Sequence, residues 1–267
     1  MKVDVGCEFD YGTEAITPAI VLVRPFSTDV QRVLAERWTS EPAVPFHDYV
    51  DGYGNLCRRL NLPPGRLRFQ YAATVEVSGE LDAFEPNARQ MPVDALPDDA
   101  LLYTMPSRYC LSDLLADRAW ELFGATEPGW GRVQAICDFV HGHVRFGYGS
   151  STPTTTAVDV FENAAGVCRD FAHLAAAFCR AMNVPARYVF GYIPDIDVPV
   201  VSPMDFCAWF EAYLGGEWWA FDARNNQRRR GRVVIGRGRD ALDVAMVTTY
   251  GAVTLHEMIV RADRVES

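Results

Sequence analysis

The chain has 267 residues, of which 49% are hydrophobic and 22% charged, a balance that is typical of a folded globular protein and excludes an intrinsically disordered one. Its net charge is −10 and its pI is about 5.0. We therefore expect no nucleic-acid partner and no anionic membrane partner, because phosphate recognition needs concentrated basic charge. No run of eighteen apolar residues occurs, so no transmembrane helix is expected.

The cysteines are odd in number, scattered, and free of any CxxC pair: Cys7, Cys57, Cys110, Cys137, Cys168, Cys179 and Cys207. This usage suits a reducing compartment better than a disulfide framework or a zinc finger. The N-terminal segment MKVDVGCEFDYG lacks the basic-then-apolar pattern of a signal peptide, so we expect a cytoplasmic location. No glycine-rich phosphate loop and no histidine cluster occurs, and we expect neither an organic cofactor nor a required metal.

Strand patterns dominate the first part of the chain. KVDVGCEFDY alternates in part, and AIVLVRPF and FQYAATVEVSG are rich in β-forming residues. Residues 1–80 are therefore predicted to form a β-sandwich-like or β-barrel module. Residues 81–107 contain four prolines and read as a surface linker. Residues 108–267 are predicted to form a core in which helices precede an antiparallel sheet, an α+β arrangement.

Two helical patterns and a short capped turn follow the linker. Ser112 is a suitable N-cap for LSDLLADRAWELFG, which Gly124 would end. Residues 130–144 carry apolar side chains at helical spacing, and Thr156 is placed to cap the short segment AVDVFENAAG. The core of the predicted second unit therefore begins with helices.

A third helix is predicted from GVCRDFAHLAAAFCRAM, residues 166–182, whose apolar residues fall on one stripe. Asn183 and Pro185 would end it. Cys168 lies in its first turn, where unpaired N–H groups and the helix dipole favour a thiolate and can help to hold an oxyanion. A cysteine here can equally be a small, inert core residue. Position alone leaves both interpretations open.

A hairpin is predicted from FCAWFEAYL-GG-EWWAFDAR, with Gly215-Gly216 as its two-residue loop. Alternation places Cys207 and Trp209 on one face, and Asp222 becomes a diagonal neighbour of residue 207. A base at position 207 would therefore be oriented by the Asp222 carboxylate, as in a nucleophile, base and acid triad. The residue at position 207, however, is a cysteine.

The segments GVCRDFAHLAAAFCRAMNVPARYVFGYI and DFCAWFEAYLGGEWWAFDARNN resemble the core of the bacterial transglutaminase-like (transglutaminase/protease) superfamily, from about Val133 through Asp263. The resemblance implies a papain-like core, in which a helix bearing the nucleophile packs on an antiparallel sheet. It also implies thiol acyl transfer: peptide, isopeptide or amide hydrolysis, transamidation or amide formation. Cys168 matches the family nucleophile and Asp222 its acid, while Cys207 stands where the family has its catalytic histidine.

A thiol replaces an imidazole poorly, because it is a weak proton shuttle at neutral pH and a second thiolate is disfavoured by like charge. His141 and His143 are alternative bases, although we prefer a surface or capping role for both. Tyr148 is a candidate oxyanion donor and Trp209 a candidate wall of a substrate groove. A packed loop tyrosine and a core tryptophan are the commoner alternatives.

Three functions remain open from the sequence. The first is an acyl transferase or protease-like hydrolase that acts through a Cys168 thioester on a peptide, a protein or a small acyl or amine substrate. The second is a catalytically impaired relative that acts as a binding module. The third is a pair formed by Cys168 and Cys207, which would form a disulfide or share a soft metal with Asp222. The presence of both Cys168 and Asp222 favours the first.

Overall fold

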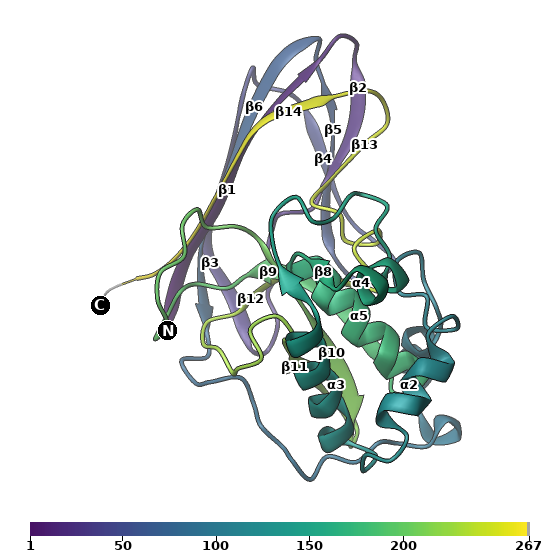
Figure 1. Cartoon of the computed structure of the whole chain (residues 1–267). Helices are drawn as coiled ribbons and strands as arrows, with labels where there is room; N and C mark the ends of the chain where they lie inside the picture. The colour runs from purple at the N-terminus through teal and green to yellow at the C-terminus, as the bar shows by residue number, and fades with distance from the viewer. Residues whose placement is uncertain (266–267) are drawn as a thin grey trace.

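The computed structural model describes residues 1–265, and its first part is a two-sheet β module in the upper half of Figure 1. The strands of the module are β1 (Lys2–Thr13), β2 (Thr17–Val21), β3 (Gln31–Glu41), β4 (Phe46–Val50), β5 (Leu56–Leu62), β6 (Gly65–Val77), β13 (Val247–Thr249) and β14 (Thr254–Arg264). One sheet has the order β14-β1-β6-β3 and the other β13-β2-β5-β4. Phe9, Leu60 and Phe69, from both sheets, share one apolar core, which confirms the predicted β-sandwich-like module.

The last two strands belong to this module and not to the core. β14 pairs antiparallel with β1, and β13 pairs with β2, so the two ends of the chain lie side by side (Figure 1). The predicted boundary, which assigned all of residues 108–267 to the core, is therefore wrong for residues 247–264. The partner of a strand is set by the distant apolar face that it completes, which the local sequence does not reveal.

The connecting segment and the first helices largely follow the predictions. Residues 81–107 include the short turns η1 (Val93–Ala95), α1 (Asp98–Leu101) and η2 (Leu102–Thr104). The helices that follow are α2 (Ala116–Phe123), α3 (Trp130–His143) and α4 (Ala157–Asn163). α2 starts later than predicted, because Ser112 lies in a turn and Leu115 is the N-cap. Thr156 is a cap, as predicted, with its hydroxyl accepting the Asp159 N–H, but it begins a helix, α4, where only a short turn was predicted.

The core packs α5 (Cys168–Ala181) against a four-stranded antiparallel sheet of order β11-β10-β9-β12. The strands of this sheet are β9 (Ala186–Tyr192), β10 (Cys207–Leu214), β11 (Glu217–Phe221) and β12 (Val233–Gly238), and a parallel pair, β7 (Arg145–Phe146) and β8 (Ala165–Gly166), precedes α5. Leu214 pairs with Glu217 around the glycine loop, as predicted. The predicted α+β core is confirmed. No helix within residues 1–265 is long and apolar enough to cross a membrane.

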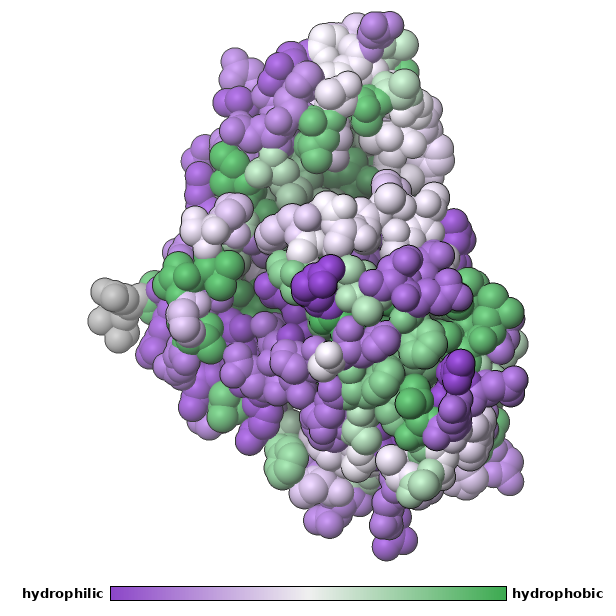
Figure 2. Space-filling model, viewed as in Figure 1, coloured by the Kyte–Doolittle hydropathy of each residue, from purple (hydrophilic) through white to green (hydrophobic). Residues whose placement is uncertain are grey.

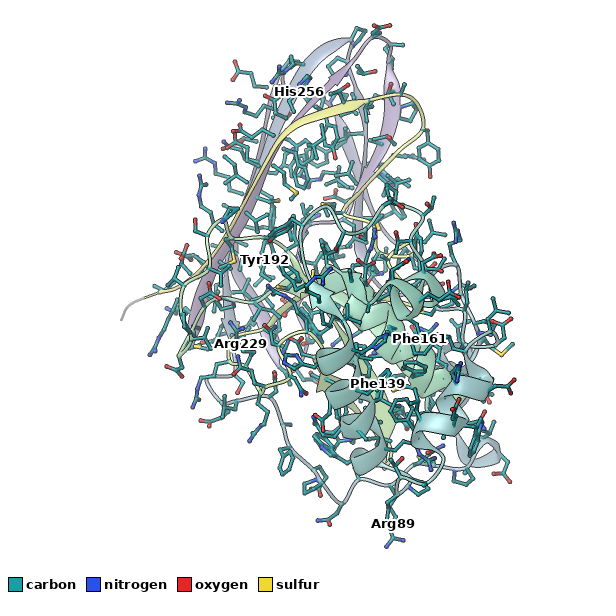
Figure 3. All side chains as sticks on the ribbon, in the orientation of Figure 1. Arg89, Phe139, Phe161, Tyr192, Arg229 and His256 are labelled. Atoms are coloured by element: carbon teal, nitrogen blue, oxygen red, sulfur yellow. The ribbon has the colours of Figure 1, made fainter. Side chains whose placement is uncertain are left out.

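Aromatic packing fixes the helices over α5. Figure 3 shows Phe139 of α3 and Phe161 of α4 turned toward one another, with ring centroids 6.4 Å apart. Both also contact Phe178 of α5, at 5.9 and 5.8 Å. Since α5 carries Cys168 at its first position, this packing also fixes the position of that cysteine.

The first turn of α5 is held by a buried carboxylate. Asp170 is fully buried and accepts the Val167 N–H at 2.8 Å, and Arg169 donates to it at 3.2 Å. A Cβ added to Gly166 would lie 2.7 Å from the Asp170 Cβ, so a glycine is needed there to seat this side chain. The negative carboxylate lies at the positive end of the helix dipole, as expected for a first-turn acid.

Candidate active site

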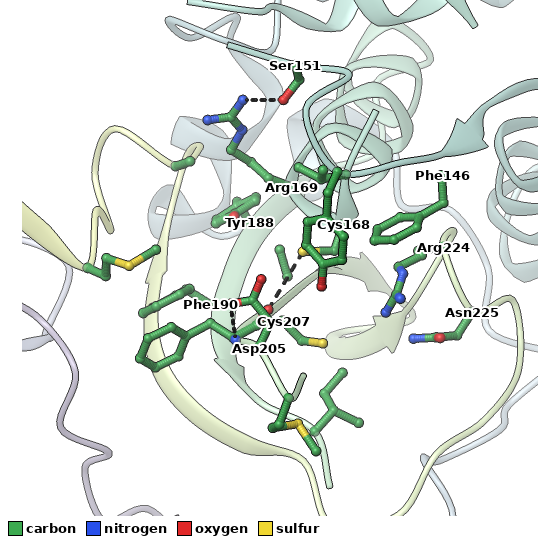
Figure 4. Close-up of a pocket in the computed structure, with 18 of the residues that line it drawn as sticks. Phe146, Ser151, Cys168, Arg169, Tyr188, Phe190, Asp205, Cys207, Arg224 and Asn225 are labelled. Carbon is green, nitrogen blue, oxygen red and sulfur yellow. Dashed lines mark hydrogen bonds between the residues drawn. The ribbon is translucent and has the colours of Figure 1, made fainter. Parts of the chain in front are cut away.

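Cys168 lies in the wall of a cavity of about 810 Å³ between the core and the β module, with its side chain half-buried. Its thiol donates to the Phe206 carbonyl at 3.8 Å (Figure 4). The backbone N–H groups of Ala208 and Arg169 lower the pKa of the thiol, although neither forms a hydrogen bond with the sulfur within the described residues. The predicted helix start therefore places the Cys168 sulfur in the cavity wall, under the influence of two backbone N–H groups.

Burial dominates the ionisation of this thiol and raises the pKa of Cys168 to about 11. The Arg224 guanidinium and the two backbone N–H groups lower the pKa, and the Asp205 carboxylate raises it further. The helix N-terminus was expected to favour a thiolate, but desolvation outweighs it here. Cys168 is therefore a thiol and not a thiolate at neutral pH.

Cys207, the first residue of β10, lines the same cavity. Burial, and then the charges of Cys168 and Asp222, raise the pKa of the Cys207 thiol far above its ordinary value. Within residues 1–265 no hydrogen bond joins the sulfurs of Cys168 and Cys207. In the same range, no group of three His, Cys, Asp or Glu side chains is arranged to hold a metal ion.

Asp222, just after β11, is 7% exposed and has both carboxylate oxygens occupied. Its Oδ1 accepts the Asn225 N–H at 2.9 Å, and its Oδ2 accepts from Asn225 Nδ2 at 2.8 Å and from Arg232 Nη2 at 3.1 Å. Arg232 also donates to Asp82 at 2.9 Å. The Asp222 carboxylate therefore connects the end of the hairpin to Asn225 and to Arg232 through hydrogen bonds.

None of the five histidines, all within the described residues, lines the cavity. His141 Nδ1 donates to the Arg224 carbonyl at 2.9 Å, and His143 Nε2 donates to the Phe161 carbonyl at 2.7 Å. His173 is fully buried and accepts a backbone N–H through Nε2 at 3.1 Å. These contacts fit the structural roles that the sequence favoured for His141 and His143.

Of the two residues predicted to line the substrate groove, Tyr148 lines the cavity and Trp209 does not. Tyr148 lines the cavity and is 63% exposed. The prediction that Trp209 walls the groove is wrong, because its side chain is 1% exposed. Trp209 packs with Val189 beneath the Arg232 guanidinium, which lies 4.9 Å from the ring centroid, and the cavity reaches only the first two residues of β10, Cys207 and Ala208.

Two charged residues beside the sulfur were not singled out from the sequence. Asp205 lines the cavity and accepts the Phe206 N–H at 2.8 Å, and burial raises the pKa of its carboxyl. Arg224 lies over the Phe146 ring at 4.2 Å, and no carboxylate within residues 1–265 forms an ion pair with it. Figure 4 shows both beside the cysteines. The sequence offered one signal for each residue. Asp205 lies two residues before Cys207, and Arg224 lies opposite Cys207 in the predicted hairpin.

The comparisons identify the class of protein that this site defines. Residues 118–223 match the family model of the transglutaminase-like superfamily. The crystal structure of a "Putative Cysteine Protease" from Cytophaga hutchinsonii is 33% identical, with a TM-score of 0.91, and the match covers 100% of this chain and 91% of that one. The chain therefore belongs to the transglutaminase-like superfamily, and its fold indicates an activity of the cysteine-protease or transglutaminase type.

Curated relatives of similar length occur in mycobacteria. An uncharacterised protein of Mycobacterium leprae is 26% identical over 232 residues, which are 83% of this chain and 81% of that protein. An uncharacterised protein of Mycobacterium tuberculosis is 27% identical over 235 residues, which are 80% of this chain and 75% of that protein. Both matches cover most of each chain, so the similarity extends beyond the core.

Proposed function

We propose that the protein is a thiol acyl-transfer enzyme in which Cys168 is the nucleophile and forms a thioester with the acyl group of its substrate. The position of the Cys168 sulfur carries this proposal. It lies at the start of α5, under the influence of two backbone N–H groups and of the Arg224 guanidinium, in a cavity large enough for a small substrate. Such donors stabilise a thiolate and also the oxyanion that forms on attack at a carbonyl.

The missing imidazole decides which acyl donors suit the site. In a thiol triad, the imidazolium protonates the departing amine of an amide substrate. Cys207 stands at that position with a strongly raised pKa, so it is a poor proton donor. An amine leaves poorly without a proton, whereas a thiol of ordinary pKa leaves as a thiolate. The site therefore favours thioesters and similarly activated acyl donors over amides.

The proposed reaction has two balanced steps. Water takes the proton of the Cys168 thiol, and the thiolate so formed attacks the carbonyl carbon of a donor thioester. The tetrahedral oxyanion then collapses, the donor C–S bond breaks, and the donor thiolate departs and takes a proton from solvent. Water or an amine then attacks the Cys168 thioester, Cys168 leaves as a thiolate, and the proton of the attacking group passes to solvent. Arg224 and the Tyr148 hydroxyl, which both line the cavity, would hold the oxyanion.

Binding without turnover is the second candidate function. Two observations favour it: the pKa values of both cavity thiols are raised, and both oxygens of Asp222 are already occupied by Asn225 and Arg232. A groove with these properties would recognise an acyl or peptide ligand and retain it unchanged.

Turnover of a matched thioester and amide tests the proposal. The wild-type protein should cleave a short acyl thioester of a soluble thiol, measured by loss of the thioester's ultraviolet absorbance, and should leave the matching amide intact. Cys168→Ala should abolish cleavage. Cys57→Ala, which removes a buried thiol of the β module, is the control and should keep it. Cleavage that survives Cys168→Ala contradicts the proposal, and ligand binding with no cleavage supports the second candidate.

A further inference from the structure

The cavity beside Cys168 has two chemically different walls. One is polar and comes from the segment after β11, with Arg224, Asn225 and Gln227. The other, which we name the aliphatic wall, comes from the end of β9 and from the loops that precede β10 and β13: Ile193, Val198, Val201, Met204, Leu242 and Val244. Figure 4 shows Phe190 on the opposite side of the two cysteines from Arg224 and Asn225.

The arginines beside the aliphatic wall are paired with carboxylates within the protein. Arg229 pairs with Asp195 at 3.3 Å, and Arg169 pairs with Asp170 at 3.2 Å. Asp205, in the loop before β10, forms no ion pair within residues 1–265, but burial raises the pKa of its carboxyl and favours the neutral form. Arg224, on the polar wall, is a cavity-lining arginine with no carboxylate in ion-pair contact in the same range. An occupant of the aliphatic wall therefore needs no charge, whereas the polar wall can accept an oxyanion or another polar group.

Part of the aliphatic wall is open to water. Val201 is 53% exposed and Leu242 is 56% exposed, although both line the cavity. Val200, beside them, is 82% exposed. Figure 2 shows apolar residues gathered on the left of the view, where the loop before β10 lies in Figure 1. An apolar occupant would remove this surface from water, which is favourable in proportion to the area covered.

We propose that the acyl group transferred by this site is an aliphatic chain of several carbons, which lies along the aliphatic wall with its carbonyl carbon at the Cys168 sulfur and its leaving thiol toward the polar wall. This inference rests on the proposed acyl transfer. The strands β9 and β10, which contribute to the cavity floor, are interior in the order β11-β10-β9-β12. The edge strands β7 and β13 each contribute a single lining residue, Phe146 and Val247. Most of this wall is therefore built from apolar side chains rather than from a free strand edge of the kind that an extended peptide uses, which favours an acyl chain over a peptide.

A binding series tests the inference without needing turnover. Straight-chain carboxamides from butanamide to octanamide resemble the acyl group and its carbonyl but lack the activated leaving group. Their dissociation constants, measured by titration calorimetry on the wild-type protein, should fall about fourfold per added methylene, the equivalent of about 0.8 kcal/mol for each methylene buried. A dissociation constant independent of chain length would overturn the inference.

Variants locate the binding to the aliphatic wall. Leu242→Asp and Val201→Asp should each flatten the dependence on chain length, so that the ratio of octanamide to butanamide affinity falls at least fourfold. Leu114→Asp is the matched control, because Leu114 is 66% exposed and lies outside the cavity, and it should keep the wild-type ratio. An unchanged ratio in both cavity variants would place the chain elsewhere and contradict the inference.

The remaining outcomes separate this inference from the proposed function. Tighter binding of a capped leucyl tripeptide than of octanamide would overturn the acyl chain in favour of a peptide. Binding that strengthens with chain length, but no Cys168-dependent cleavage of thioesters, would support the aliphatic wall and contradict the enzyme. Cleavage that depends on Cys168 but is equally fast for acetyl and octanoyl thioesters would support the enzyme and contradict the aliphatic wall.

Discussion

Replacing Cys207 by histidine places an imidazole at the one position where the family has its base and this chain has a thiol. Burial raises the pKa of Cys168 to about 11, so nearly all of this thiol is protonated at neutral pH. An imidazolium beside the sulfur would stabilise the thiolate, and general acid–base catalysis typically contributes about 10²–10⁴-fold. We therefore expect Cys207→His to raise turnover of a thioester by up to that range and to permit cleavage of an amide.

The assay for this prediction compares thioester and amide cleavage by matched variants. Cys207→Ala should show no gain, because it removes the thiol without adding a base. Cys168→Ala in the Cys207→His background should remove the gain. Asp222→Asn in that background should reduce it, since Asp222 would orient the new imidazole. Equal turnover in Cys207→His and wild type, with both folded, would refute the assignment of position 207 as the base position.

Three further predictions concern ionisation and stability. A thiol with a raised pKa stays protonated at neutral pH, so alkylation of Cys168 by iodoacetamide should rise about tenfold per pH unit from pH 7 and level off only near 11; a plateau below pH 8 would contradict the burial of this sulfur. Asp205→Asn removes a charge that raises the pKa of Cys168 and should speed this alkylation, by less than about tenfold, whereas Asp195→Asn, at a carboxylate already paired with an arginine, should change it little. Glu211 forms ion pairs with two arginines, and Glu211→Gln removes the carboxylate that both arginines need. This change should lower the free energy of unfolding in urea by about 3–5 kcal/mol, whereas Glu217→Gln, at an exposed position, should lower it by less than about 0.5 kcal/mol.

The elements that the sequence identified are those whose signals are local. The start of α5 follows from Gly166 and the acidic residue at Asp170, and the hairpin follows from its two-glycine loop. The family pattern places its nucleophile and its histidine in one site. The resemblance therefore indicated that Cys168 and Cys207 line one cavity, as they do in the structure. The pairing of β14 with β1 could not, because strands so far apart in sequence carry no local signal of their partner.

Side-chain environments were less predictable than elements. Alternation correctly places Trp209 on the face of Cys207, but it does not reveal that the Arg232 guanidinium covers the indole. It likewise places Asp205 near position 207 without showing that burial raises the pKa of its carboxyl. The ionisation of Cys168 depends on the balance between burial and the N–H groups of the helix start, and only the packing around the sulfur decides that balance.

The central claim is that Cys168 carries the acyl group as a thioester. Intact-protein mass spectrometry, followed by peptide mapping, after brief incubation with an octanoyl thioester at pH 8 tests it most directly. We expect one octanoyl group per chain, attached to Cys168, released by hydroxylamine and absent from Cys168→Ala. An adduct on another cysteine, or an unmodified wild-type protein while the donor thioester is consumed, would contradict the account.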